Sequence, residues 1–275
     1  MRCGRRALST VPPVRVTVLG KSPSWQDAGG ACSGYLLQQG DTNVLLDCGN
    51  GVFGKLRERI SYTEIDAVLI SHLHADHFLD LVPFSYALGN SLLQQPVPVH
   101  SHQGTDSPAR PRLIAPAGAG QVFRRVVGAW GGETLIEDSF ALEEYAPGEE
   151  VTVGPIKAGF HPVPHFIDTF AVSLSSGESK VTYSADTRPG PEIVEIARDA
   201  DLLIVEATLD SPEPEGDRGH MTPAEAGEQA RLAGAKRVVL THISDELDPD
   251  WAREQASAAF GAPVELAREF EAYEV

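Results

Sequence analysis

The chain has 275 residues and a formal net charge of -17 at pH 7. This length supports one large α/β domain with a sizeable core, and the acidic charge disfavours extensive binding along a nucleic-acid backbone, because phosphates are repelled. Three cysteines without a Cys-x-x-Cys pair argue against a disulfide framework or a cysteine-based zinc knuckle and favour a reducing, cytoplasmic location.

Residues 1–13 are predicted to form a frayed extension. Met1–Arg6 are basic, but Ala7–Pro13 supply no apolar core of signal-peptide length. No apolar stretch approaches the roughly 20 residues that a membrane-spanning helix requires. We therefore expect no membrane partner, and we expect residues 14–275 to form a single functional domain.

Short runs rich in β-branched and apolar residues follow, with helical patterns between them. The predicted strands are Val14–Leu19, Gly34–Gln38, Asn43–Asp47, Ala67–Ile70, Val151–Val153, Ile156–Phe160, Thr169–Ser173, Lys180–Ser184, Leu202–Glu206 and Arg237–Thr241. The predicted helices are Val52–Ile60, His77–Leu88, Pro191–Ala197, Thr222–Ala233 and Pro249–Phe260. This order predicts an α/β fold in which two mixed sheets are sandwiched between helices.

The segment Ser71–His77, with the sequence SHLHADH, directly follows the apolar run Ile65–Ile70. It brings together three imidazoles and one carboxylate, which are the ligand types that zinc and similar divalent metals prefer. The alternative is a solvated polar turn, but so many ligand-type residues in one short turn are hard to explain by packing. The segment therefore predicts a metal site.

The zone Leu92–Gly120 is dense in Pro, Gly, Ser and Ala and is predicted to be irregular. A plain surface loop and a lid near the site are both compatible with it. His100 and His102 lie there, and without a neighbouring carboxylate or a strand to orient them we interpret them as exposed loop histidines.

Three more ligand-type residues lie where a predicted strand gives way to a loop. His165 follows Ile156–Phe160 and a proline-rich turn, Asp186 follows Lys180–Ser184, and His242 follows Arg237–Thr241. A catalytic site with two metals needs about six or seven protein ligands, which usually arrive from several strand ends. This repeated placement predicts that distant segments complete one site.

With these residues the chain resembles the metallo-β-lactamase superfamily of metal hydrolases. The similarity spans Val14 to the C-terminus and implies an αββα sandwich with two mixed β-sheets. It also implies two divalent metals, zinc or else manganese or iron, with Asp186 bridging them. One metal would be held by His72, His74 and His165, and the other by Asp76, His77 and His242. Asp47 would orient one of the ligand histidines from beneath.

The third histidine has two candidates, because the sequence HPVPH offers both His161 and His165. In related phosphodiesterases this ligand precedes an aromatic and a small residue at a fixed spacing, which Phe170 and Ala171 match from His165. We therefore favour His165. His161 would then support a ligand or belong to the turn.

The sequence RGHMT, which contains His220, resembles a motif of ribonuclease Z and its small phosphodiesterase relatives. There a histidine assists cleavage of the phosphate ester, so the resemblance assigns a catalytic role to His220. Asp76, besides binding one metal, is expected to orient the attacking water and is the second catalytic residue. A histidine that merely packs near the following helix is the alternative. Four further residues could line the pocket, although hydroxyl groups after a strand more often satisfy backbone groups: Ser33, Ser184, Thr187 and Arg188.

Among these relatives, the expected activity is hydrolysis of a small phosphodiester such as a cyclic nucleotide. The best-known β-lactamases use a cysteine where this chain has Asp186. Ribonuclease Z carries a long arm, often between the residues matched by His165 and Asp186, and two strands and a turn leave no room for one here. A ribonuclease Z-type tRNA endonuclease, a lactonase or thioesterase, and a regulatory metal-binding module remain alternatives. Extended nucleic acid is disfavoured as a partner, and the resemblance also suggests a homodimer.

Overall fold

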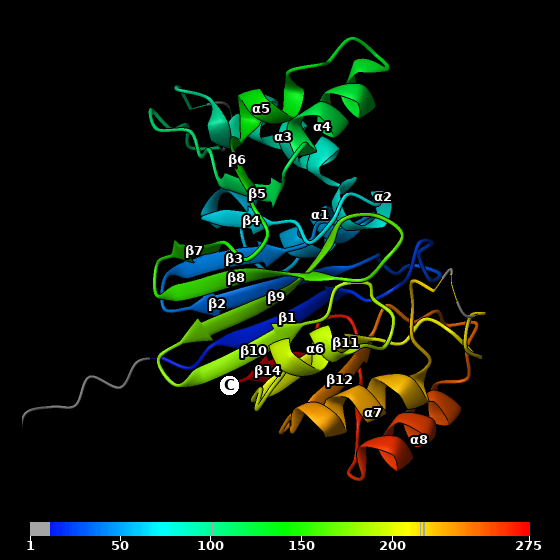
Figure 1. Ribbon diagram of the computed structural model, residues 1–275. Helices are drawn as coiled ribbons and strands as arrows, with labels where there is room; N and C mark the ends of the chain where they lie inside the picture. The colour runs from blue at the N-terminus through cyan, green and yellow to red at the C-terminus, as the bar shows by residue number, and fades with distance from the viewer. Residues whose placement is uncertain (1–11, 99, 101, 215, 217) are drawn as a thin grey trace, which may run out of the picture.

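The computed structural model describes residues 12–98, 100, 102–214, 216 and 218–275. Most of the predicted extension at residues 1–13 therefore lies outside the described residues. Within them, two seven-stranded sheets pack face to face and helices cover both outer faces (Figure 1). The predicted α/β sandwich is confirmed.

The first sheet is antiparallel from β14 to β3 and parallel from β3 to β6. Its order is β14 (Ala272–Glu274), β1 (Arg15–Gly20), β2 (Gly34–Gln39), β3 (Thr42–Leu46), β4 (Ala67–Leu69), β5 (Arg112–Pro116) and β6 (Ala141–Tyr145). Because the last four strands are parallel, their carboxyl ends lie at one edge of the sheet.

The second sheet repeats this division, with antiparallel pairs from β7 to β10 and parallel pairs from β10 to β13. Its order is β13 (Glu265–Leu266), β12 (Val238–Thr241), β11 (Leu202–Glu206), β10 (Ser179–Tyr183), β9 (Thr169–Ser176), β8 (Ile156–Val163) and β7 (Glu150–Val153). Several ligand-type residues follow these strand ends.

Two groups of helices cover the outer faces (Figure 1). The first sheet carries α1 (Val52–Arg57), α2 (Ala75–Phe78), α3 (Leu81–Asn90), α4 (Ala119–Gly128) and α5 (Leu135–Ser139), with 3₁₀ turns at Tyr62–Glu64 and Leu92–Gln94. The second carries α6 (Pro191–Ile196), α7 (Pro223–Ala233) and α8 (Pro249–Phe260). No helix in this described part of the chain combines the length and the apolar character needed to cross a bilayer.

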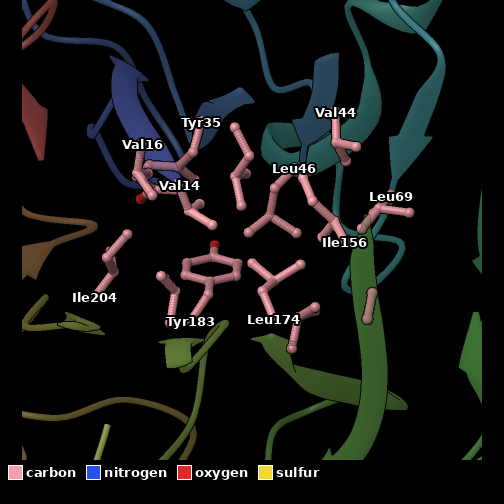
Figure 2. Packing of buried hydrophobic residues seen from close by; sticks show 14 of the residues in the cluster. Val14, Val16, Tyr35, Val44, Leu46, Leu69, Ile156, Leu174, Tyr183 and Ile204 are labelled. Carbon is pink, nitrogen blue, oxygen red and sulfur yellow. The ribbon is translucent and has the colours of Figure 1, made fainter. Parts of the chain in front are cut away.

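The core divides according to the alternation of side chains along each strand. In β3, Val44 and Leu46 belong to the cluster between the sheets, whereas Leu45 belongs to the cluster beneath the helices. Figure 2 shows the inner layer, where Tyr35 and Leu46 of the first sheet face Tyr183 of the second. Burial on both faces explains why these strands are apolar along nearly their whole length.

The prediction of an irregular zone at Leu92–Gly120 is wrong for its second part. Arg112–Pro116 form β5, which pairs in parallel with β4 and β6, and α4 begins at Ala119. The run RLIAP is too short and too closely flanked by proline to stand out as a strand, and only its pairing with β4 stabilises it. His100 and His102 are exposed, as predicted.

The predicted helix His77–Leu88 is two helices. α2 ends at Phe78 and α3 begins at Leu81. Pro83 has no N–H to donate to the carbonyl of Leu79, so one continuous helix would lose a hydrogen bond and crowd the proline ring. The break is useful, because Asp80 lies in it and accepts a hydrogen bond from the Phe53 backbone N–H.

Gly227 provides a test of the packing between α7 and α8. A Cβ at this position would overlap the carbonyl oxygen of Ala256, whereas a Cβ at Gly54, in α1, would meet nothing within 4 Å. We expect Gly227→Ala to lower the free energy of unfolding by about 1–3 kcal/mol through overpacking. Gly54→Ala should raise it by about 0.5–1 kcal/mol, because alanine loses less backbone freedom in a helix.

Urea-unfolding midpoints of the two variants and the parent chain measure both changes. If Gly227→Ala stabilised the protein as Gly54→Ala does, the close approach of α7 to α8 would be wrong.

Candidate metal centre

The segment Ser71–His77 begins just beyond the carboxyl end of β4. His72 forms an isolated antiparallel bridge with Thr169 of β9, so the turn is fixed to both sheets. His74 has extended backbone and precedes α2, whose first turn carries Asp76 and His77. This change from extended chain to helix directs all four ligand-type side chains into one region.

The second sheet delivers the other residues to the same region. The Nε2 of His165 and the Nε2 of His72 each lie 3.1 Å from the Nδ1 of His74. Asp186 Oδ2 lies 3.7 Å from His72 Nε2 and 3.9 Å from His165 Nε2. Asp186 therefore lies among three histidines that two separate segments contribute, His72 and His74 from Ser71–His77 and His165 from the turn after β8.

A second group shares Asp186. The Nε2 of His242 lies 3.2 Å from Asp76 Oδ2 and 3.4 Å from Asp186 Oδ2, and the Nε2 of His77 lies 3.4 Å from Asp186 Oδ1. The structure thus brings together all seven predicted ligands in two groups joined by Asp186. Their binding of metal stays a prediction.

The chemistry of these groups fits divalent cations. His77 Nε2 and Asp186 Oδ1 are buried and have no hydrogen-bond partner among the described residues. Buried polar atoms are rarely left in this state, because their lost hydration is not replaced. A cation would satisfy both atoms, and imidazole nitrogen with carboxylate oxygen is the donor set that zinc and its neighbours prefer.

The pKa values of the histidines follow the same logic. Burial lowers the pKa of His72, His74 and His165, which keeps these imidazoles neutral, as metal ligands must be. Burial alone would also lower the pKa of His77, but the carboxylates of Asp186 and Asp47 raise it well above its usual value. The second group therefore attracts positive charge strongly.

An outer set of hydrogen bonds orients the rings. Asp47, fully buried, lies where it was predicted, with Oδ2 2.7 Å from His77 Nδ1 and 3.0 Å from the Tyr183 hydroxyl. The Nδ1 of His165 donates to the carbonyl of Gly219 at 2.8 Å, and the Nδ1 of His242 lies 2.8 Å from Thr208 Oγ1. These bonds leave each Nε2 facing the cluster. Such outer partners fix the tautomer and orientation of metal-binding histidines.

His220 lies at the border of this cluster. Its ring stacks on His242 at 5.6 Å between centroids and lies 4.9 Å from the ring of His165. Its Nδ1 is 3.0 Å from Oε1 of Glu206, which is fully buried at the end of β11. Burial alone would lower the pKa of His220, but the hydrogen bond and charge of Glu206 raise it to about 9.

Glu206 belongs to this cluster although the sequence does not reveal it, because in the sequence it is only the last residue of a predicted strand. It accepts hydrogen bonds from the backbone N–H groups of Thr187 and Met221 and from the hydroxyl of Thr208. The sequence signal that could have identified Glu206 is a carboxylate at the end of an apolar strand, the position that the other ligand-type residues also take. Thr208 contacts both Glu206 and His242, but no sequence pattern indicates this.

The other proposed residues are placed differently. His161 lies on β8 with Nε2 2.8 Å from Ser173 Oγ and belongs to neither group, so the structure brings His165 and not His161 to the cluster. Ser33, Ser184 and Thr187 are fully buried, and the last two bond to backbone groups. Arg188, which follows Thr187 in the chain, is exposed.

The αββα sandwich and the two linked groups of histidine and aspartate define a metal-dependent hydrolase. The family description "Beta-lactamase superfamily domain" matches residues 42–243, which is more than half of the chain. The chain belongs to the beta-lactamase superfamily.

Individual relatives agree with this assignment. The chain is 29% identical over 261 residues to "Probable metallo-hydrolase YhfI" of Bacillus subtilis (strain 168), covering 93% of this chain and 97% of the relative. It is 30% identical over 295 residues to "Ribonuclease Z" of Myxococcus xanthus (strain DK1622), covering 92% and 95%. The crystal structure of the metallo-beta-lactamase fold protein YhfI from Bacillus subtilis superimposes with a TM-score of 0.81 at 27% identity, covering 96% of this chain and all of that one.

His165 and His161 form a matched pair for testing the ligand set. We expect His165→Ala to lower the metal content of the purified protein, because one ligand nitrogen of the first group is lost. His161→Ala should leave the metal content unchanged, because that side chain lies outside both groups. Elemental analysis after reconstitution measures both. A loss of metal in His161→Ala with full occupancy in His165→Ala would reverse the assignment.

Proposed function

We propose that the protein is a phosphodiesterase that uses two divalent metal ions to hydrolyse a small phosphodiester such as a cyclic nucleotide. The observation that carries this proposal is the imidazole of His220, held by buried Glu206 against two ligand groups that share Asp186. The shared carboxylate supports a pair of metals, and the added histidine supports cleavage of an ester with a poor leaving group.

When bound, the two ions, zinc or else manganese or iron, would supply positive charge for the phosphate and lower the pKa of a water molecule in the site. His72, His74 and His165 would hold one ion, and Asp76, His77 and His242 the other, while Asp186 belongs to both groups. Asp76 would also hold the attacking water in position, since its Oδ2 lies among the second group at 3.3 Å from His77 Nε2.

His220 has the placement of a general acid. Its Nδ1 is engaged by Glu206, so Nε2 is the nitrogen that can deliver a proton to the departing oxygen. Because Glu206 raises the pKa of His220, the imidazole keeps this proton at neutral pH. Protonation of the leaving oxygen removes the negative charge that would otherwise develop on it.

The charge and the loop lengths support a small substrate. The net charge of -17 repels a long polyanion, whereas one phosphate can be held locally by bound cations. Between His165 and Asp186 the chain forms β9 and β10 joined by a short turn, with no inserted arm in this fully described stretch. The relative named ribonuclease Z supports phosphodiester chemistry and makes RNA cleavage the second candidate.

A substrate comparison with the metal-loaded protein tests this function. We expect turnover of 3′,5′-cyclic AMP and bis-p-nitrophenyl phosphate that exceeds turnover of a lactone, a thioester or a tRNA precursor. Removing the metal with a chelator should abolish the activity, and adding zinc should restore it, because the metals position and activate the water. Preferred cleavage of the tRNA precursor would favour the RNA alternative, and preferred lactone or thioester turnover would reject phosphodiester hydrolysis.

His220→Ala tests the proton donor separately from metal binding. We expect kcat on cyclic AMP to fall about 10²–10⁴-fold, the usual contribution of a general acid, with an unchanged metal content. Glu206→Gln should shift the alkaline limb of the pH profile to lower pH, because the imidazole loses the charge that raises its pKa and therefore loses its proton earlier. Unchanged kcat in His220→Ala would remove this residue from the mechanism.

A further inference from the structure

We propose that Phe166 forms a stacking platform for a nucleobase of the substrate at the border of the metal centre. This inference rests on the proposed phosphodiesterase function and specifies the chemical class of the group that the phosphate carries. It assigns a binding role to a residue outside both ligand groups.

Phe166 is a large apolar side chain that is 54% exposed, and the neighbouring Ile167 is 38% exposed. Scattered apolar side chains are common on protein surfaces, so exposure alone identifies no site. The location of this ring is informative, because its centroid lies 4.9 Å from the ring of His165 and 5.9 Å from the ring of His220. An exposed aromatic face therefore lies next to a ligand-type histidine and the proposed proton donor.

The position of the ring is fixed by the same peptide that orients His165. A Cβ at Gly219 would overlap the Phe166 ring, so the ring lies directly against the glycine backbone. The carbonyl of Gly219 accepts the hydrogen bond from His165 Nδ1, and its N–H donates to Glu213 Oε2 at 2.8 Å. Gly219 therefore orients His165 through its carbonyl group and provides the backbone surface against which the Phe166 ring packs.

A hollow of about 350 Å³ adjoins this ring, which is within the range of roughly 300–1,000 Å³ for small-molecule sites. Its walls come from Pro147, Pro162, Val163, Pro164, His165, Phe166, Ile167, Asp168, Thr169 and Phe170. Seven of these ten residues are apolar, and polar atoms make up nearly half of the wall surface. A flat, uncharged ring fits such walls, whereas a second phosphate would meet the Asp168 carboxylate and find no cation among these residues.

Stacking on an aromatic side chain suits a nucleobase because every base presents a π face. The arrangement thus divides recognition into two parts. The metal centre would take the phosphate, which all phosphodiesters share, and Phe166 would take the base, which distinguishes a nucleotide from a simple phosphodiester.

Binding of hydrolysis-resistant ligands tests the platform without relying on turnover. We expect the metal-loaded protein to bind AMP more tightly than ribose 5-phosphate in isothermal titration calorimetry. Phe166→Ala should weaken AMP binding roughly 5- to 150-fold, the range for loss of one base–aromatic stack, and leave ribose 5-phosphate binding unchanged. Phe166→Tyr should retain AMP binding, because it keeps the ring. Trp130→Ala is the control, because it removes a similarly exposed aromatic ring after α4. It should change the affinity for neither AMP nor ribose 5-phosphate.

Kinetics supply a second readout. For thymidine 5′-(p-nitrophenyl phosphate), Phe166→Ala should raise KM with little change in kcat, whereas methyl p-nitrophenyl phosphate, which has the same leaving group and no base, should be unaffected. Equal losses on both substrates, or AMP binding no tighter than that of ribose 5-phosphate in the parent protein, would overturn the platform. AMP binding that depends on Phe166 in a protein without phosphodiester turnover would instead reject the proposed function and retain the platform.

Discussion

Buried negative charge at the junction of the two sheets is the constraint on which the rest of the structure depends. Asp47 and Asp186 are almost completely buried, and Asp76 is nearly so. Placing a carboxylate in a protein interior costs several kcal/mol unless hydrogen bonds and positive charge compensate. Imidazoles surround these carboxylates, yet buried atoms of His77 and Asp186 have no hydrogen-bond partner in the part of the chain that the structure describes. Cations would supply the missing partners, and the sandwich is the rigid frame that keeps these groups together.

Asp47 shows how the frame and the site are joined. It follows β3 of the first sheet and accepts a hydrogen bond from Tyr183, at the end of β10 in the second. It also accepts hydrogen bonds from the backbone and hydroxyl groups of Ser71 and orients His77. Glu206 has the same function on the other side, where it joins the loops after β10 and β11 to His220. Asp47 orients His77, and Glu206 orients His220. Because Asp47 also bonds to Tyr183 of the second sheet, the positions of the ligand-type side chains depend on the packing of the two sheets.

The same arrangement would reconcile an acidic protein with the proposed phosphate-bearing substrate. The surface charge acts at long range and repels polyanions, whereas cations bound at the two ligand groups would act within a few ångströms. The hollow beside Phe166 adjoins this region, and its lining offers prolines and aromatic rings together with the carboxylate of Asp168. The two ligand groups would thus act on the phosphate, and Phe166 in the adjoining loop would select substrates that carry a nucleobase.

The sequence alone determined the family, the α/β sandwich and seven side chains that converge, because ligand-type residues recur at the ends of predicted strands and SHLHADH is a dense local signal. It left His161 and His165 as alternatives, because the sequence does not show that His161 stays within β8 while His165 lies beyond the end of this strand. It also missed β5, whose short apolar run becomes a strand only through pairing with β4 and β6, and Glu206, whose role depends on His220 arriving from another loop. Local patterns record the periodicity of strands and helices, whereas the neighbours of a strand and the partner of a buried carboxylate are decided only when distant segments pack together.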